Sequence, residues 1–398
     1  MKTASINIDR VQSVDFLRGL VMIIMALDHV RAYFHFDTFL FSPTDLERTT
    51  GAMFATRLIT HLCAPTFIFL AGTSAYFIAQ RKTLKDTSIF LLTRGLWLVI
   101  LQVTIIQFAW NFDPGFHFLS SNIISTIGFC MILLSFLIHL PFNGILITGI
   151  VVIALHNTLD NISFERGSIN DVIWSFLHQR NLYDLGNNYS FRFLYPIIPW
   201  FGVMALGFCF GRLYDKRYFP EEKKKLLLQL GSLSLIVFFA LRMSNSYGDP
   251  TPWTYQQQAG FTVLSFLNLE KYPPSLLFLC FTLGISLVIL GILEGRNLER
   301  WRPVTLFGKV ALFYYVLHVY VIHFLALVTV WVMGYPWQTM IFLRAHSQPH
   351  PLIKGNFGFS LGVIYFIWIA VVCALYPLCV YWNSFKIRNK SKWWVSYV

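Results

Sequence analysis

Charged residues are scarce in this chain of 398 residues: Asp, Glu, Lys and Arg make up 13% of it, and hydrophobic residues 56%. A soluble domain carries about twice that charged fraction, so the composition excludes an ordinary soluble protein. Apolar runs of about 20 residues, the length that crosses a bilayer as a helix, recur along the chain. We therefore expect an all-α polytopic membrane protein that forms a single helical bundle over residues 1–398.

Several familiar motifs are also missing. The six cysteines lie inside apolar runs without CxxC spacing, so we expect small apolar packing residues rather than disulfides or metal ligands. The chain has no Gly-rich phosphate loop, no HExxH or GxSxG motif and no zinc-spaced Cys/His set. It also shows no internal repeat, which argues against a transporter built from two related halves.

The apolar runs predict about ten membrane spans. They lie roughly at 14–36, 58–79, 88–110, 119–139, 142–158, 194–212, 226–243, 274–293, 308–333 and 358–382. Most of the 31 Lys and Arg residues fall in the segments that share one side with the N-terminus, so the positive-inside rule predicts that both termini are cytoplasmic. The net charge of +12 is then explained by these segments and by anionic membrane lipid, with no nucleic acid as partner.

The long connections 157–193, 244–273 and 334–357 fall on the outer side and are rich in polar and aromatic residues. Loops of this length are often functional. One interpretation is a lid or vestibule whose aromatic rings hold a sugar. The alternative is an interfacial belt of Trp and Tyr with short surface helices.

The first predicted span carries ionisable residues, which are costly in a bilayer and often mark a reaction or transport site. Arg18 and His29 share one helical stripe about 16 Å apart along the axis, and Asp28 can pair with Arg31 at i, i+3. Arg31 and His35 are expected to reach water at the outer end. Asp28 and His29 are too short to do so, and they are therefore our first candidates for a site.

The ninth predicted span places His318 at about the same depth as His29. Tyr314 and Tyr315 precede His318 by four and three residues, where a phenol can bond the ring or cap a pocket. A lone buried His is usually an interhelical hydrogen-bonding residue, but two at matched depth beside Asp28 favour a functional pair. His61, at the outer edge of the second span, is as easily interfacial as catalytic.

Arg18 and Arg94 lie at the cytoplasmic ends of their spans. Arginine binds phosphate with two parallel hydrogen bonds, so these two residues are candidates for binding a phosphate-rich cofactor from the cytosol. The simpler interpretation is that they only obey the positive-inside rule.

The segment SVDFLRGLVMIIMALDH (13–29) resembles the opening span of the heparan-alpha-glucosaminide N-acetyltransferase-like membrane proteins. Further similar segments are HLCAPTFIFLAGTSA (61–75), YPIIPWFGVMALGFCFGRL (195–213), KYPPSLLFLCFTLG (271–284) and FGKVALFYYVLHVYVIH (307–323). In this resemblance Arg18 matches the motif arginine, and His318 matches a later histidine. His29 falls where the wider acyltransferase superfamily has its essential histidine, whereas the heparan enzymes carry Asn.

The resemblance implies transfer of an acetyl group from cytosolic acetyl-CoA to an acceptor across a membrane, here the bacterial cytoplasmic (inner) membrane. Arg18 and Arg94 would bind the cofactor phosphates, and His29, oriented by Asp28, would act as general base. His318 with Tyr314 or Tyr315 would stabilise the thioester oxyanion. A covalent acetyl-imidazole is the alternative route. The acceptor would be a hydroxyl or amine of a glycan or small molecule, and a homodimer stays open.

Two other functions compete. A proton-coupled secondary transporter could use Asp28, His29 and His318 in its site, although the missing repeat argues against it. A lipid-binding or scaffolding bundle would leave this acid–base set unexplained.

Overall fold

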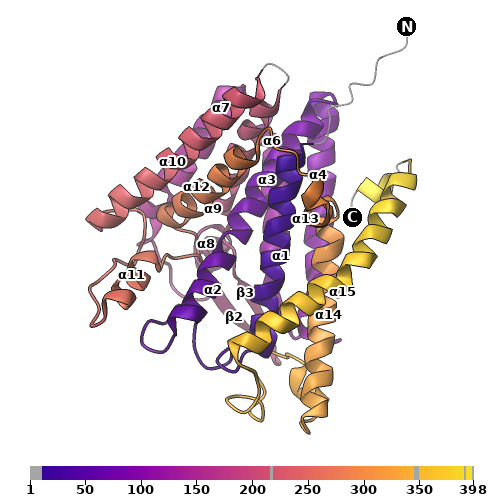
Figure 1. The fold of residues 1–398 in the computed structure, drawn as a ribbon. Helices are drawn as coiled ribbons and strands as arrows, with labels where there is room; N and C mark the ends of the chain where they lie inside the picture. Colours follow the sequence, from indigo (N-terminus) through magenta and orange to yellow (C-terminus); the bar gives the residue numbers. More distant parts are fainter. Residues whose placement is uncertain (1–10, 216–217, 345–348, 390, 397–398) are drawn as a thin grey trace.

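The computed structural model describes residues 11–215, 218–344, 349–389 and 391–396, and the chain folds into a bundle of long, mostly upright helices (Figure 1). The helices are α1 (Gln12–Phe34), α2 (Gly51–His61), α3 (Cys63–Ala79), α4 (Leu84–Leu101), α5 (Gln107–Asn111), α6 (Ile123–Leu137), α7 (Phe142–Leu155), α8 (Ile169–Leu177), α9 (Ile197–Phe210), α10 (Pro220–Ser244), α11 (Ala259–Leu267), α12 (Leu276–Leu293), α13 (Arg302–Lys309), α14 (Ala311–Val332) and α15 (Leu361–Arg388). A π-helical stretch, Gln102–Ile106, joins α4 to α5.

Eight helical segments of the described chain are long and apolar enough to cross a membrane. They are 51–79, 84–111, 142–159, 197–214, 220–244, 276–293, 311–332 and 361–388. The predicted polytopic helical membrane protein is confirmed at this level, and the predicted spans agree with these helices to within a few residues at most ends. Two further predicted spans correspond to α6, which is shorter, and to α1, which carries the ionisable residues.

Close helix contacts depend on glycine. A Cβ at Gly72 of α3 would overlap the carbonyl oxygen of Met204 in α9, and a Cβ at Gly207 would overlap that of Phe69. Thr73 donates a hydrogen bond to the Gly207 carbonyl oxygen at 3.0 Å. Small residues at this point therefore let the backbones of α3 and α9 approach closely.

A second glycine contact joins α1 to α13. A Cβ at Gly19 would overlap the carbonyl oxygen of Val304, and one at Gly308 would overlap that of Asp15. The backbones of the two helices therefore meet directly. This contact brings Arg18 of α1 and Lys309 of α13 to the same end of the bundle.

Three short strands were not predicted from the sequence. They are β1 (Phe118–Ser121), β2 (Asn181–Gly186) and β3 (Tyr189–Phe193), in the order β1-β3-β2. β3 is parallel to β1 and antiparallel to β2. Asn187 and Asn188 both have positive φ between β2 and β3, as in the tight turns that favour Asn at such positions. The predicted short surface helices of the outer loops are present as α8 and α11.

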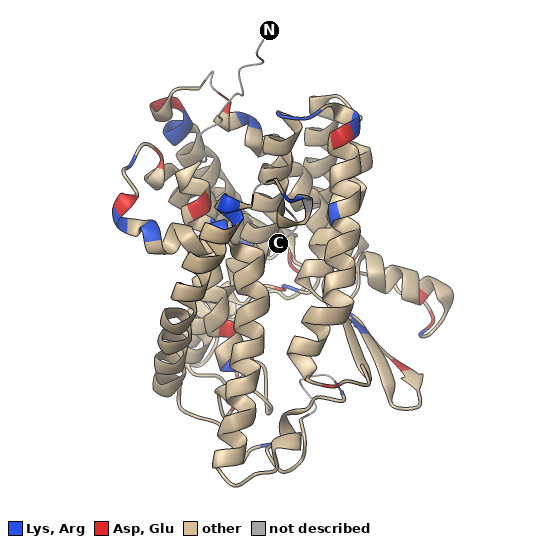
Figure 2. Cartoon of the chain, turned by 90° about the vertical axis from the view of Figure 1, so that its right-hand side faces the viewer, with Lys and Arg blue, Asp and Glu red and all other residues tan. Residues whose placement is uncertain are grey.

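The side chain of Gln107, the first residue of α5 after the π-helical stretch, holds β1 in place. Gln107 Nε2 donates to the Phe118 carbonyl oxygen at 2.7 Å, and Gln107 Oε1 accepts from the Ser120 backbone N–H at 3.1 Å. The sheet is thereby held against the helices at the end of the bundle opposite the start of α1 (Figure 1). Figure 2 shows that Lys and Arg residues gather toward the other end, where α1 begins.

Candidate functional site

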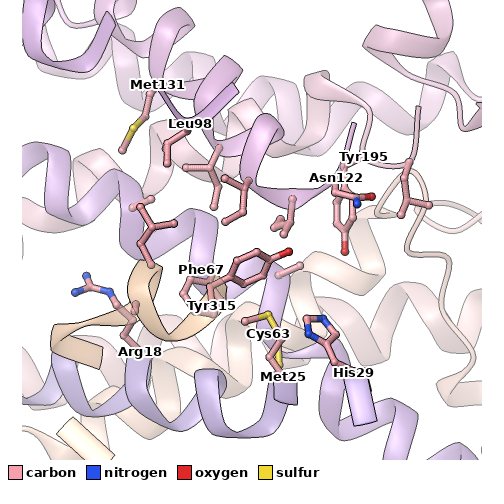
Figure 3. A pocket seen from close by; sticks show the side chains of 18 of the residues that line it. Arg18, Met25, His29, Cys63, Phe67, Leu98, Asn122, Met131, Tyr195 and Tyr315 are labelled. Carbon is pink, nitrogen blue, oxygen red and sulfur yellow. The ribbon is translucent and has the colours of Figure 1, made fainter. Parts of the chain in front are cut away.

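A cavity of about 460 Å³ runs inside the bundle. Its lining includes Arg18 near the start of α1 and His29 near the end of the same helix, with Met25 between them. Figure 3 shows Arg18 and His29 at opposite ends of this space, with Met25, Cys63, Phe67 and Tyr315 between them. The cavity is therefore elongated, with a basic end, an apolar middle and a polar outer end.

The two predicted imidazoles meet. His29 Nδ1 lies 2.7 Å from His318 Nε2, and the rings are nearly parallel, with an interplanar angle of 5°. The residues are 289 positions apart in sequence and lie on α1 and α14. His318 is fully buried, whereas His29 lines the cavity and His318 does not. The two histidines lie together, as their matched depth predicted, but only His29 borders the cavity, and a functional role of the pair stays a prediction.

The hydrogen bonds of the pair define which nitrogen is free. His318 Nδ1 lies 2.8 Å from the Tyr314 carbonyl oxygen, which can only accept, so Nδ1 carries the proton of the neutral ring. His318 Nε2 then accepts from His29 Nδ1–H. In neutral His29 the remaining nitrogen, Nε2, therefore holds a lone pair. Such a nitrogen can take up a proton or attack an electrophile in the cavity.

Asp28 lies next to His29 but is bound elsewhere. Its two carboxylate oxygens accept from Arg31 at 2.9 Å and from Arg57 at 2.6 Å. The predicted pairing of Asp28 with Arg31 is confirmed. His29 Nδ1–H donates its orienting hydrogen bond to His318 Nε2, in place of the expected contact with Asp28.

Arg31 and His35 do not reach water, contrary to the sequence-based expectation. Their exposed fractions are 7% and 4%. Arg31 is held by the carboxylate of Asp28, and His35 Nδ1 accepts from the Asp37 backbone N–H at 3.2 Å. The hydropathy pattern missed this burial because the loops after α1 fold back over its end, where Phe359 pairs with His35 and Phe36.

Four basic residues line the basic end of the cavity. They are Arg18, Arg94, Lys309 and Lys386. Arg18 donates to Ser74 Oγ at 2.8 Å and lies 3.4 Å from Asp15. Arg18 and Arg94 were candidates from the sequence, whereas Lys309 and Lys386 were only expected to be surface charges. Their place in the cavity depends on how α13 and α15 pack against α1.

The two predicted tyrosines separate. Tyr315 lines the cavity, where its ring meets His29 edge-on with centroids 6.2 Å apart. Tyr314 does not line it; its ring stacks on His318, with centroids 5.0 Å apart. Of the two, Tyr315 is placed to contact a ligand. His61 is buried against Phe278 and likewise does not line the cavity.

The polar end of the cavity, which the sequence-based topology places on the outer side, holds residues that were not predicted from the sequence. Lys271 and Tyr272 come from the loop before α12, and Arg192 and Tyr195 from β3 and the segment after it. The Arg192 side chain lies over the Phe118 ring, 5.0 Å from its centroid. These residues sit in the loops expected to form a vestibule, but no local pattern distinguishes them from other loop residues.

These features define a class: a polytopic helical membrane protein with an internal cavity that joins a cluster of basic residues to a buried histidine pair. Comparison by sequence gives the family. The chain belongs to the heparan-alpha-glucosaminide N-acetyltransferase family, since residues 10–243, more than half of its length, match the catalytic region of that family. His29 and Asp28 lie inside the matched region and His318 outside it. Curated proteins offer no match to the chain. Family membership supports a membrane acetyltransferase.

Proposed function

We propose that this protein moves an acetyl group from cytosolic acetyl-CoA to a hydroxyl or amine of an acceptor on the outer side of the membrane. The observation that carries the proposal is the single cavity lined by four basic residues at one end and by His29 at the other. The phosphates of acetyl-CoA need positive charge where they bind, and the thioester needs a neutral base where it reacts. This cavity offers both.

The membrane topology in this proposal has ten passes, with α1 and α6 crossing in addition to the eight long apolar segments. Both termini are cytoplasmic, and the membrane is the bacterial inner membrane. The gathering of Lys and Arg toward one end supports this orientation (Figure 2). Among the basic residues that entered the prediction, Lys2, Arg10, Lys216, Arg217 and Lys390 lie outside the described residues.

The donor occupies the cavity from the basic end. Arg18 and Arg94, with the two lysines of that end, bind the phosphates of acetyl-CoA. The pantetheine arm extends along the apolar middle, past Met25 and Phe67. About 16 Å separate Arg18 from His29 along α1, so the extended arm brings the thioester to His29.

His29 Nε2 performs the proton transfer. In direct transfer it takes the proton from the acceptor hydroxyl or amine while the acceptor atom attacks the thioester carbon. The C–S bond then breaks, and His29 returns the proton to the CoA thiolate. Tyr315 donates to the thioester oxygen as negative charge develops on it. His318 does not reach the thioester, because both of its ring nitrogens are already bonded; it acts as a positioning residue.

A covalent route uses the same lone pair. His29 Nε2 attacks the thioester carbon and CoA leaves as the thiolate. The acceptor then attacks the acetyl-imidazole, the bond from the acetyl carbon to Nε2 breaks, and the proton that the acceptor loses neutralises the thiolate. Asp28 in either route stays with Arg31 and Arg57 and offsets their charge beside the cavity.

The acceptor approaches through the outer end of the cavity. Tyr195 and Tyr272 offer rings for stacking on a sugar, and Arg192 and Lys271 offer donors for its oxygens. This combination suits a glycan or a small sugar-like molecule, in a site open to membrane lipid around it. A homodimer remains a prediction.

The test is an acetyl-transfer assay on the purified full chain with radiolabelled acetyl-CoA. Wild-type protein should release CoA with time, and His29→Ala should lose the activity by about 10²- to 10⁴-fold, the range of a general base. His61→Ala, a buried histidine outside the cavity, serves as control and should keep most of it. Absence of acetyl-CoA binding, together with pH-driven solute uptake into vesicles, would support the secondary transporter instead.

A further inference from the structure

A second cluster of titratable side chains lies on the outer side of the bundle, apart from the cavity. His156, Asp160 and His178 each offer one ligand atom, and these atoms all lie within 4.8 Å of one another. Of the described residues, only these form such a group of three. None of them lines the cavity, and the proposed acetyl transfer uses none of them.

The two imidazoles of this cluster lack the partners that buried polar groups need. His156 is 2% exposed and His178 is fully buried. Both ring nitrogens of His156, and Nδ1 of His178, have no hydrogen-bond partner. Unpaired polar atoms in a protein interior cost free energy, so a ligand that binds one nitrogen of each ring would remove part of this cost.

Asp160 supplies the charge that a cation requires. One of its oxygens lies 2.9 Å from His178 Nε2, and the other accepts from Asn157 Nδ2 at 2.8 Å. Each of the two Asp160 oxygens therefore has a nitrogen partner that holds the carboxyl group in place.

The surroundings hold these side chains in place. Asn157 Oδ1 accepts from the Leu276 backbone N–H at the start of α12, at 2.8 Å. The Trp174 ring packs on His178, with centroids 5.3 Å apart. A hydrogen-bonded carboxylate ligand and fixed imidazole rings are the usual support around a protein metal site.

We infer that His156, Asp160 and His178 form a binding site for a divalent transition metal ion, with zinc as the best fit. Imidazole nitrogen with one carboxylate oxygen is a donor set that Zn²⁺ accepts, and a water would complete the tetrahedron. Tetrahedral ligands on zinc stand about 3.4 Å apart, so the Asp160–His178 contact of 2.9 Å would open slightly around the ion, while ligand atoms that lie up to 4.8 Å apart would move closer.

A metal ion at this site would link the segment after α7 to the segment between α8 and β2. His156 and Asp160 follow the end of α7, whereas His178 follows α8 and stands three residues before β2. The β2–β3 hairpin leads to Arg192 and Tyr195, which line the outer end of the cavity. A bound ion would thus stabilise the segment that carries these two residues without taking part in the chemistry.

Zinc content tests the inference directly. The full chain, purified with a tag that contains no histidine, is dialysed against buffered Zn²⁺ and analysed by mass spectrometry for metal. About one zinc per chain is expected for wild type and well under half for His156→Ala and Asp160→Asn. His117→Gln is the matched control: His117 pairs with Asp113 at 2.9 Å on the outer side but has no third ligand. It should keep the full zinc content.

A second measurement follows metal binding and thermal unfolding together, starting from wild-type protein. Chelator-treated wild type is titrated with Zn²⁺, and with Co²⁺ as a spectroscopic probe, while its thermal unfolding is followed. Saturable binding of about one ion, with a rise in Tm that Asp160→Asn lacks, supports the site. If folded wild-type protein bound no more Zn²⁺ than His156→Ala, the metal site would be ruled out. The unpaired imidazole nitrogens would then be explained by hydrogen bonds to internal water.

Discussion

His318 shows how one side chain can matter without touching a ligand. Its Nδ1 is tied to the Tyr314 carbonyl oxygen, and its Nε2 accepts from His29. This chain of two hydrogen bonds leaves the lone pair of neutral His29 on Nε2, on the residue that borders the cavity. The tautomer of His29 is therefore set by a residue from the other end of the chain.

Removing the acceptor at position 318 should disable this arrangement. His318→Leu is expected to lower kcat for acetyl transfer by about 10²-fold, within the range that a general base contributes, while KM for acetyl-CoA changes little. His318→Gln should recover part of the rate, because its side-chain oxygen can accept from His29 Nδ1–H. Steady-state kinetics and the pH profile of kcat measure both effects. Equal activity of the Leu variant and wild type would contradict the positioning role.

Arg18 should act on cofactor binding rather than on the reaction. A hydrogen bond to a charged group contributes about 1.5–3 kcal/mol, so Arg18→Gln is expected to raise KM for acetyl-CoA by at least about tenfold with kcat nearly unchanged. Arg48, an exposed arginine paired with Asp45 in an outer loop, provides the control Arg48→Gln, which should leave both constants unchanged. A fall in kcat alone would argue against a phosphate contact at Arg18.

At the scale of the elements, α13 is the piece that completes the basic end of the cavity. It is a short helix that packs against α1 through Gly19 and Gly308 and brings Lys309 to the cavity. The sequence-based prediction began the ninth span at residue 308, so it covered α14 and only the last two residues of α13, and it gave α13 no element of its own.

A methyl group at Gly19 should separate these two helices. Gly19→Ala places a Cβ against the Val304 carbonyl oxygen, and overpacking of this kind costs about 1–3 kcal/mol. We expect a lower Tm and a higher KM for acetyl-CoA. Gly362→Ala is the control, since a Cβ there meets no atom within 4 Å. If Gly19→Ala left both quantities at wild-type values, the direct contact would not be needed for the site.

At the scale of the whole molecule, the proposed function requires one internal cavity that is reached from both sides of a membrane. α1 runs along that cavity, and it packs against α3, α13, α14 and α15. The Trp368 indole N–H of α15 donates to the Ile23 carbonyl oxygen of α1 at 2.7 Å. The first and last helices of the bundle are therefore in direct contact.

The orientation of the bundle can be measured in intact cells. Asn187→Cys places a thiol in the turn between β2 and β3, and Lys224→Cys places one near the start of α10 at the opposite end. A membrane-impermeant maleimide should label the first variant and not the second, with wild type as the background for the native cysteines. The reverse pattern would place the termini outside.

The sequence by itself determined the class of fold, because ten apolar stretches of membrane length leave few alternatives to a helical bundle. It also singled out His29 and His318, because an ionisable residue in such a stretch is costly and has to be explained. Asp28 and Arg31 could be paired from their spacing on one helix.

Only the tertiary structure decided which of these residues borders the cavity and which stands behind it. The ion pair of Arg57 with Asp28 and the place of Lys309 in the same cavity as Arg18 join different helices, and the cluster of His156, Asp160 and His178 joins the segments that follow α7 and α8. Hydropathy and helical periodicity describe one segment at a time, whereas these contacts depend on how helices pack and on where the outer loops fold back.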